Sequence, residues 1–139
     1  MTVFVDTSVF MRRLLKQPGA FTDWSAWGLV VASELLSVEA HRVLDRLRVQ
    51  HAFGDAELGE LHRLLQASLR ALEFVRLSRA VLKRAANPFP TALGTLDSIH
   101  LASALLWMEE RGEDMTLVTH DAQLAIAARA CGLDVQTTP

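Results

Sequence analysis

Four acidic residues of this sequence lie next to apolar segments, where an isolated carboxylate is unusual. They are Asp6, Glu39, Asp97 and Asp121, each expected where a strand meets a helix or on the flank of a helix. Carboxylates rarely enter apolar surroundings unless they are paired or hold a metal. No cysteine or histidine spacing in the chain suits zinc, whereas several carboxylates suit a hard cation such as Mg²⁺ or Mn²⁺. The pattern therefore indicates nuclease-like chemistry assisted by a metal ion.

The elements that must position these acids are predicted from apolar patterning and from capping and turn residues. Strands are expected at 2–5, 28–32, 72–77 and 115–119, with an edge strand at 133–135. Helices are expected at 7–15, 21–27, 33–49, 55–69, 78–86 and 95–110, and a last one begins at Asp121 and ends before Gly132. Caps are expected at Ser33, Asp55, Ser78 and Thr95.

Strands that alternate with helices predict an α/β fold, with a mostly parallel central sheet covered by helices on both faces. In such sheets, ligands bind beyond the carboxyl ends of the strands. Asp6 and Asp121 fall at those ends, and Asp97 falls at a helix N-terminus that can share the same rim. Each acid also has a simpler interpretation: Asp6 and Asp121 as helix caps, Asp97 as a partner of the helix dipole, and Glu39 as a solvated residue.

Length and composition describe a globular protein. A chain of 139 residues, half of them hydrophobic, is expected to form a single domain over 1–139 with one good core. No apolar run is long and charge-free enough to span a bilayer, and the N-terminus lacks the charged region of a signal peptide. Cys131 is the single cysteine, which fits a reducing compartment. These features favour a cytoplasmic location.

Charge is distributed unevenly along the chain. Residues 1–84 hold 12 Lys+Arg against 9 Asp+Glu, whereas residues 85–139 hold 2 against 7, so the two parts carry +3 and −5. The net charge of −2 alone would argue against a nucleic-acid partner. Bound metal ions would add positive charge at an acidic site, and basic residues elsewhere would hold phosphates. The asymmetry permits a nuclease without identifying one.

Four segments of the chain carry candidate motifs: Val3 to Ser8, Ser37 to Arg42, Pro90 to Ala104, and Val118 to Asp121 with the residues up to Leu133. Together they resemble the motifs of the PIN-domain ribonucleases, and most closely those of VapC-type toxins. Any one of these motifs would be weak evidence, but all four occur in order over nearly the whole chain. Ser98 and Ile99 replace the commoner Ala-Leu of the third motif, and Gly94 stands where relatives often carry arginine.

The resemblance implies a PIN-like three-layer α/β/α fold and a Mg²⁺-dependent endoribonuclease, with Mn²⁺ able to substitute. Such a toxin cuts cellular RNA and inhibits translation and growth until a cognate antitoxin binds it, and homodimerisation is expected from the family alone. Asp6 and Asp97 would be the principal metal ligands, and Asp121 would ligate directly or through water. Glu39 would complete the site and could orient or deprotonate the attacking water. One and two metal ions both remain open.

Several neighbouring residues are candidates for supporting these acids. Thr7, Ser8 and Thr119 could contribute hydroxyl groups around the metal ligands. Arg42 lies three residues after Glu39 and could steady that carboxylate or reach a phosphate. A core role is favoured for His100, with support of an active-site carboxylate as the alternative. For Trp24 and Trp27, core packing and a hydrophobic groove for a partner helix are about equally favoured.

Two other functions compete with the ribonuclease. A non-catalytic PIN module that binds a partner or regulates it would be expected to lose one or more acids, and all four are present. A metal phosphatase or a structure-specific DNA nuclease could use the same acids. The small chain shows no evident helical arch or DNA-binding appendage, so this third interpretation ranks below the other two.

Overall fold

Five short strands form one parallel sheet in the order β3-β2-β1-β4-β5. The computed structural model describes residues 1–138. The strands are β1 (Thr2–Val5), β2 (Leu29–Ser33), β3 (Glu73–Val75), β4 (Thr116–Val118) and β5 (Asp134–Gln136). The helices are α1 (Thr7–Leu14), α2 (Leu35–Val49), α3 (Asp55–Arg70), α4 (Arg79–Ala85), α5 (Thr95–Arg111) and α6 (Ala122–Ala130).

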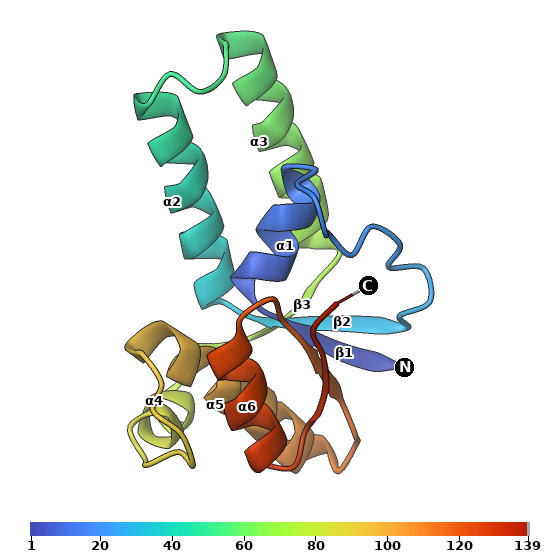
Figure 1. Cartoon of the computed structure of the whole chain (residues 1–139), viewed down its shortest axis with the longest axis vertical. Coiled ribbons are helices and arrows are strands. Elements are labelled where there is room, and N and C mark those ends of the chain that lie inside the picture. Colours follow the sequence, from blue (N-terminus) through green and yellow to red (C-terminus); the bar gives the residue numbers. More distant parts are fainter. Residues whose placement is uncertain (139) are drawn as a thin grey trace.

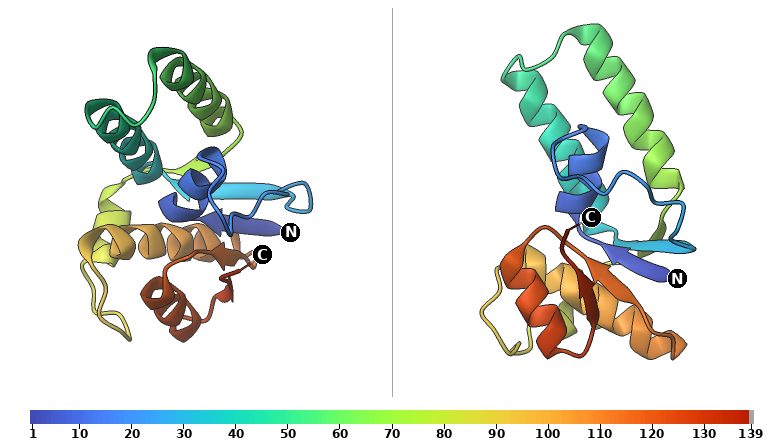
Figure 2. Two further views of the ribbon diagram at one scale, coloured as in Figure 1. Left: turned by 45° about the horizontal axis from the view of Figure 1, so that its top comes forward. Right: turned by 45° about the vertical axis from the view of Figure 1, so that its right-hand side comes forward.

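The helices cover the two faces of the sheet in two groups. Helices α1, α2 and α3 lie on one side, and α4, α5 and α6 lie on the other (Figure 1). The hairpin of α2 and α3 extends away from the sheet, as the further views also show (Figure 2). This three-layer α/β/α arrangement with an all-parallel sheet confirms the predicted fold class, and the expected edge strand near 133–135 is β5.

The two cores follow from the alternation of side chains along the central strand. Val3 and Val5 of β1 pack into the core beneath α1, α2 and α3, whereas Phe4 packs into the core beneath α5 and α6. Successive side chains of a strand point to opposite faces, so three consecutive apolar residues supply both cores. All three are fully buried. This anchoring fixes where β1 ends and therefore where Asp6 lies.

One predicted helix is wrong. Residues 21–27 form an irregular connection with a turn and no helix. Asp23 accepts hydrogen bonds from the backbone N–H and the hydroxyl of Ser25, and such local bonds compete with helical ones. Trp27 is buried and Trp24 packs against it at a ring-centroid distance of 5.1 Å, so both residues contribute to the core beneath α1, α2 and α3.

Several helix caps differ by one residue from those expected. Ser78 caps α4 as predicted, and its hydroxyl accepts a hydrogen bond from the Val81 N–H. Gly54 and Gly94 hold the cap positions before α3 and α5, so Asp55 and Thr95 are the first residues of those helices. Ser33 ends β2, and its hydroxyl still accepts a hydrogen bond from the Leu35 N–H at the start of α2. None of the helices within residues 1–138 is long and apolar enough to cross a membrane.

Candidate active site

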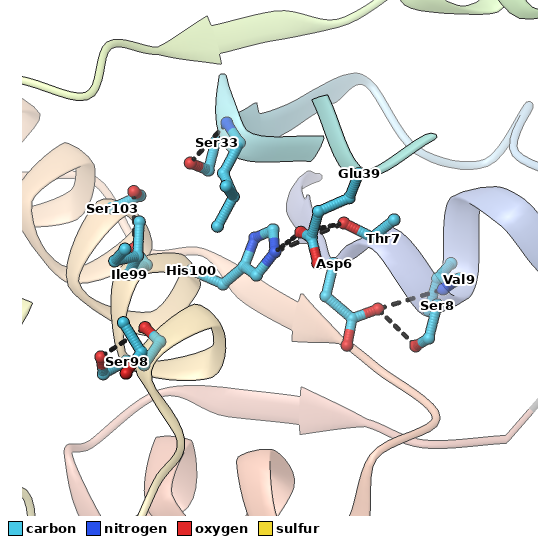
Figure 3. Close-up of polar contacts among 12 residues, drawn as sticks. Asp6, Thr7, Ser8, Val9, Ser33, Glu39, Ser98, Ile99, His100 and Ser103 are labelled. Carbon is cyan, nitrogen blue, oxygen red and sulfur yellow. Dashed lines mark hydrogen bonds and ion pairs between the residues drawn. The ribbon is translucent and has the colours of Figure 1, made fainter. Parts of the chain in front are cut away.

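Asp6 lies directly after the central strand and is fixed by three donors. Its Oδ1 accepts hydrogen bonds from the Ser8 hydroxyl at 2.6 Å and from the Val9 N–H at 3.0 Å (Figure 3). The Thr119 hydroxyl donates to Oδ2 from the end of β4. The side chain is 4% exposed. Asp6 is thus the N-cap of α1 and, at the same time, a buried carboxylate held in one orientation without a cationic partner.

Asp121 repeats this arrangement on the neighbouring strand. It is the N-cap of α6, and its Oδ1 accepts a hydrogen bond from the Leu124 N–H at 2.9 Å. Its own backbone N–H donates to the Thr119 hydroxyl oxygen at 2.9 Å. Thr119 therefore connects Asp6 to Asp121 across the carboxyl ends of β1 and β4, which pair directly in the sheet.

Glu39 is held by side chains from two other helices. The Thr7 hydroxyl donates to its Oε1 at 2.7 Å, and His100 Nε2 lies 2.6 Å from the same oxygen (Figure 3). Burial would raise the pKa of Glu39, but the hydrogen bonds from His100 and Thr7 outweigh it, so the pKa lies below its ordinary value. Glu39 is therefore kept ionised in a half-buried position.

His100 does more than fill the core, which was the role favoured from the sequence. The residue is 2% exposed, yet its Nε2 faces Glu39 and also lies 3.3 Å from the Thr7 hydroxyl oxygen. The helix α5 brings it there because His100 follows Asp97 by three residues and shares its side of the helix. This spacing is the sequence signal that places His100 on the side of the acids, but it does not identify Glu39 as the partner.

Asp97 lies in the first turn of α5 and completes the group of acids. Its pKa is raised above the ordinary value, first by partial burial and then by the negative charges of Asp121 and Asp6, with a smaller contribution from Glu39. The neighbouring His100 opposes this effect. Asp121, Asp6 and Glu39 are therefore close enough to Asp97 to act on it electrostatically, although the four acids come from positions spread over most of the chain.

The chemistry of these donors suits a hard divalent cation. They are carboxylates, and within residues 1–138 no lysine or arginine forms an ion pair with Asp6, Glu39, Asp97 or Asp121. The negative charges of Asp121, Asp6 and Glu39 repel the Asp97 carboxylate, and a bound cation would reduce this repulsion. In the described part of the chain, however, no three His, Cys, Asp or Glu side chains gather into a ready-made metal-binding arrangement. The carboxylate oxygens are the type of ligand that Mg²⁺ and Mn²⁺ prefer. To bind such an ion, the acidic side chains would have to move closer to one another than they are in this structure.

Arg42, which was considered from the sequence, lies differently, and His120 lies beside Phe21. Arg42 does not steady Glu39: it pairs with Asp45 at 3.3 Å, and its side chain is 65% exposed. Glu39 turns inward to His100, whereas Arg42 finds a partner three residues further along the outer face of α2. The ring of His120 lies 5.1 Å from that of Phe21, and burial followed by the charge of Arg12 lowers its pKa.

Comparison with known proteins gives one family. The model of the PIN domain family matches residues 3–130, which contain all four acids. No curated protein matches the sequence significantly.

Proposed function

Because the chain belongs to the PIN domain family, whose members are generally metal-dependent nucleases, we propose that it is a Mg²⁺-dependent endoribonuclease. It would hydrolyse phosphodiester bonds in cellular RNA and thereby inhibit translation and growth. The observation that carries this proposal is the convergence of the acids: the Thr119 hydroxyl joins Asp6 to the Asp121 N–H, and the charges of both acids raise the pKa of Asp97. No lysine or arginine among the described residues forms an ion pair with these four acids, so a bound cation would neutralise their negative charge.

The finer assignment to the VapC-type toxins rests on the resemblance of the four motifs. It includes inhibition by a cognate antitoxin and a homodimeric state, for which the family resemblance is the only support. Asp6, Asp97 and Asp121 would hold the ion, and Mn²⁺ could take the place of Mg²⁺.

The proposed mechanism assigns separate work to the acids and their neighbours. Asp6, Asp97 and Asp121 would hold the divalent ion, which would supply an activated water molecule and positive charge for the phosphate. Ser8, Thr119 and the Val9 N–H hold Asp6 in place, so this ligand needs little reorganisation. Glu39, whose lowered pKa keeps it ionised, orients the attacking water or accepts its proton.

Controlled expression of the wild type beside Asp97→Asn tests this function. Growth is followed, and RNA cleavage sites are read by end mapping. We expect growth arrest and discrete RNA ends with the wild type alone, because the variant lacks a principal ligand. Equal growth and intact RNA for both proteins, with each found soluble and folded, would contradict the proposal.

A non-catalytic, partner-binding PIN module is the second candidate. It is favoured by one observation, the lack of a ready-made group of three metal-binding side chains within residues 1–138. Binding of Mn²⁺, followed by its electron paramagnetic resonance signal, separates the two functions. A nuclease should bind Mn²⁺ in the wild type and bind it weakly in Asp97→Asn. A protein that neither binds Mn²⁺ nor cuts RNA would be the binding module.

A further inference from the structure

Three cationic side chains lie at the end of α1, and two of them already face other groups. Arg13 lies over the ring of Trp24, with 4.5 Å between its guanidinium carbon and the ring centroid. Lys16, just beyond the helix, lines a pocket together with Glu60 of α3. The third is Arg12, which forms no ion pair with any residue within 1–138. Arg12 is therefore the member of this group that remains free to bind an anion.

Arg12 lies on the side of α1 that faces the acids. It follows Ser8 by four residues, so the two side chains share one face of the helix, about 6 Å apart along its axis. The Ser8 hydroxyl donates to Asp6 Oδ1 at 2.6 Å (Figure 3). Helical side chains tilt towards the N-terminus, so that of Arg12 starts in the direction of Ser8. Arg12 is thus about one helical turn from a side chain that touches a proposed metal ligand.

The ring of His120 gives a second measure of where this guanidinium group lies. Burial lowers the pKa of His120 first, the positive charge of Arg12 lowers it further, and the negative charge of Asp6 raises it. Both charges therefore act on one ring, which directly precedes Asp121. Arg12 Nη1 also lies 3.6 Å from the position that a Cβ on Gly19 would occupy. The guanidinium group therefore lies close to Gly19, at the rim of the acid site.

The side-chain nitrogens of Arg12 are open to solvent. The residue is half-buried, and its side chain makes no hydrogen bond to another residue within 1–138. None of these nitrogens is enclosed by the described protein without a partner, so they face outwards. A guanidinium group presents its N–H donors in a planar fork that matches a phosphate. Because the acids repel the RNA backbone, a cation at their rim favours its approach.

We propose that Arg12 binds a phosphate of the RNA backbone next to the phosphate that is cut, and so fixes the register of the strand over the acids. The inference rests on the proposed endoribonuclease function. Contacts to phosphates position a protein on a nucleic acid without reading its sequence. Arg12 should therefore contribute to the binding and cleavage of RNAs that differ in sequence around the cut.

The salt dependence of RNA binding tests this contact without cleavage. Fluorescein-labelled RNA is titrated with Asp97→Asn protein by fluorescence anisotropy, between about 50 and 200 mM KCl. Each phosphate contact to a single strand contributes about 0.7 to the slope of log Kobs against log salt concentration. Adding Arg12→Gln should lower the slope by about 0.7. Arg12→Lys keeps the charge but loses the fork, so it should weaken binding and keep the slope.

The matched control is Arg70→Gln. Arg70 is likewise exposed in the last turn of a helix and forms no ion pair within 1–138. It ends α3 just before β3 begins, so it lies at the edge of the parallel sheet opposite the acids. Its replacement should leave the slope unchanged, and both variants should melt at nearly the wild-type temperature. A slope lowered equally by both variants, or by neither, would overturn the contact.

A neutral backbone linkage tests where the contact is made. Once the cut has been mapped, each flanking phosphate in turn is replaced by an uncharged methylphosphonate. We expect Arg12→Gln to lower kcat/KM on unmodified RNA roughly tenfold, because a hydrogen bond to a charged group is lost. With one of the modified RNAs, Arg12→Gln and the wild type should be equally slow. A tenfold loss by Arg12→Gln on every modified RNA would overturn the contact.

The two experiments distinguish a failure of this contact from a failure of the nuclease proposal. If the wild type cuts no RNA and Arg12→Gln still lowers the salt slope, the phosphate contact stands and the nuclease proposal fails. If the wild type cuts RNA and Arg12→Gln changes neither the slope nor the rate, the nuclease stands and the contact is wrong. Absence of any RNA binding by the Asp97→Asn protein would also overturn the contact.

Discussion

Asp97 carries its negative charge at an energetic cost to the fold. Its pKa is raised because the carboxyl group is partly buried and faces Asp121 and Asp6. A carboxyl group whose pKa is raised by folding destabilises the folded protein wherever the pH forces it to ionise. An arrangement that costs stability and serves no packing purpose is typical of a functional site.

Asp97→Asn is therefore expected to increase stability while abolishing cleavage. Without divalent metal at pH 7, the variant should unfold at a higher temperature than the wild type. The difference should shrink as the pH falls through the raised pKa of Asp97 towards its ordinary value of 3.8, because the wild-type carboxyl group then becomes protonated. RNA cleavage should fall by more than about 100-fold, the upper end of losses seen when only a supporting residue is removed.

The matched control for this prediction is Asp114→Asn, which removes the same charge at an exposed position after α5. It should change neither the melting temperature nor the cleavage rate appreciably. A variant Asp97→Asn that melts below the wild type at pH 7 would show that the repulsion inferred from the raised pKa is not real.

His100 is expected to act on the reaction through Glu39. In His100→Leu, Glu39 keeps the Thr7 hydrogen bond but loses that of His100, so burial should raise the pKa of Glu39. The acid limb of the profile of kcat/KM against pH should move to higher pH, and the rate should fall roughly 10- to 100-fold. His100→Gln, which can still donate a hydrogen bond, should restore part of the rate. An unshifted profile in a folded His100→Leu protein would leave His100 with a packing role only.

At the scale of elements, the connection from β4 to α6 ties the site together. Thr119 donates a hydrogen bond to Asp6 and accepts one from the Asp121 N–H, so one hydroxyl joins the ends of two paired strands. Thr119→Val keeps the shape and leaves both buried partners unsatisfied. We expect a loss of about 1–3 kcal/mol in the free energy of unfolding, measured by urea denaturation. Thr116→Val, at the start of β4, should cost much less. Equal losses for both variants would contradict this role.

The elements around the acids could be predicted from sequence because their signals are local. The apolar residues of β1 and the caps Asp6 and Asp121 are read from a few neighbouring positions. The connection over residues 21–27 was mispredicted as helical because Asp23 and Ser25 hydrogen-bond to one another in a turn, and the spacing of the two tryptophans arises from core packing. Local sequence alone does not reveal whether this segment forms helical hydrogen bonds or the turn made by Asp23 and Ser25.

The contacts of the site were harder to predict than its elements. Asp6 caps α1, which is one of the two interpretations drawn from the sequence, and it is also buried, so its capping role is compatible with the proposed role as a metal ligand. The contact of His100 with Glu39 joins residues 61 positions apart, and a single sequence holds no direct record of it. The place of Arg12 beside Gly19 depends on the path of the loop after α1, which no periodic pattern encodes.

At the scale of the whole molecule, strand order explains why distant acids meet. The central strand β1 pairs with β2 on one side and β4 on the other, and all run in parallel. Parallel strands end at one edge of the sheet, so Asp6 and Asp121 share an edge because β1 and β4 are neighbours. Helices α2 and α5 lie in the two opposite layers (Figure 1). They carry Glu39 and Asp97, and Asp97 senses the charges of Asp121, Asp6 and Glu39.

If these acids hold a divalent cation as proposed, the stability of the whole fold should depend on that cation. An ion that binds the folded chain alone stabilises it by about 2.7 kcal/mol when its concentration is 100 times its Kd. Mg²⁺ should therefore raise the melting temperature of the wild type, EDTA should reverse the rise, and Asp97→Asn should respond little. Without metal, Asp97→Asn should melt at a higher temperature than the wild type, and in Mg²⁺ the wild type should melt at the higher temperature. The reason is that a cation bound by Asp6, Asp97 and Asp121 would offset the repulsion that these acids exert on one another at Asp97. If Mg²⁺ left the wild type unchanged, or stabilised Asp97→Asn equally, the acids would not form a metal site, and the non-catalytic module would become the better account of the protein.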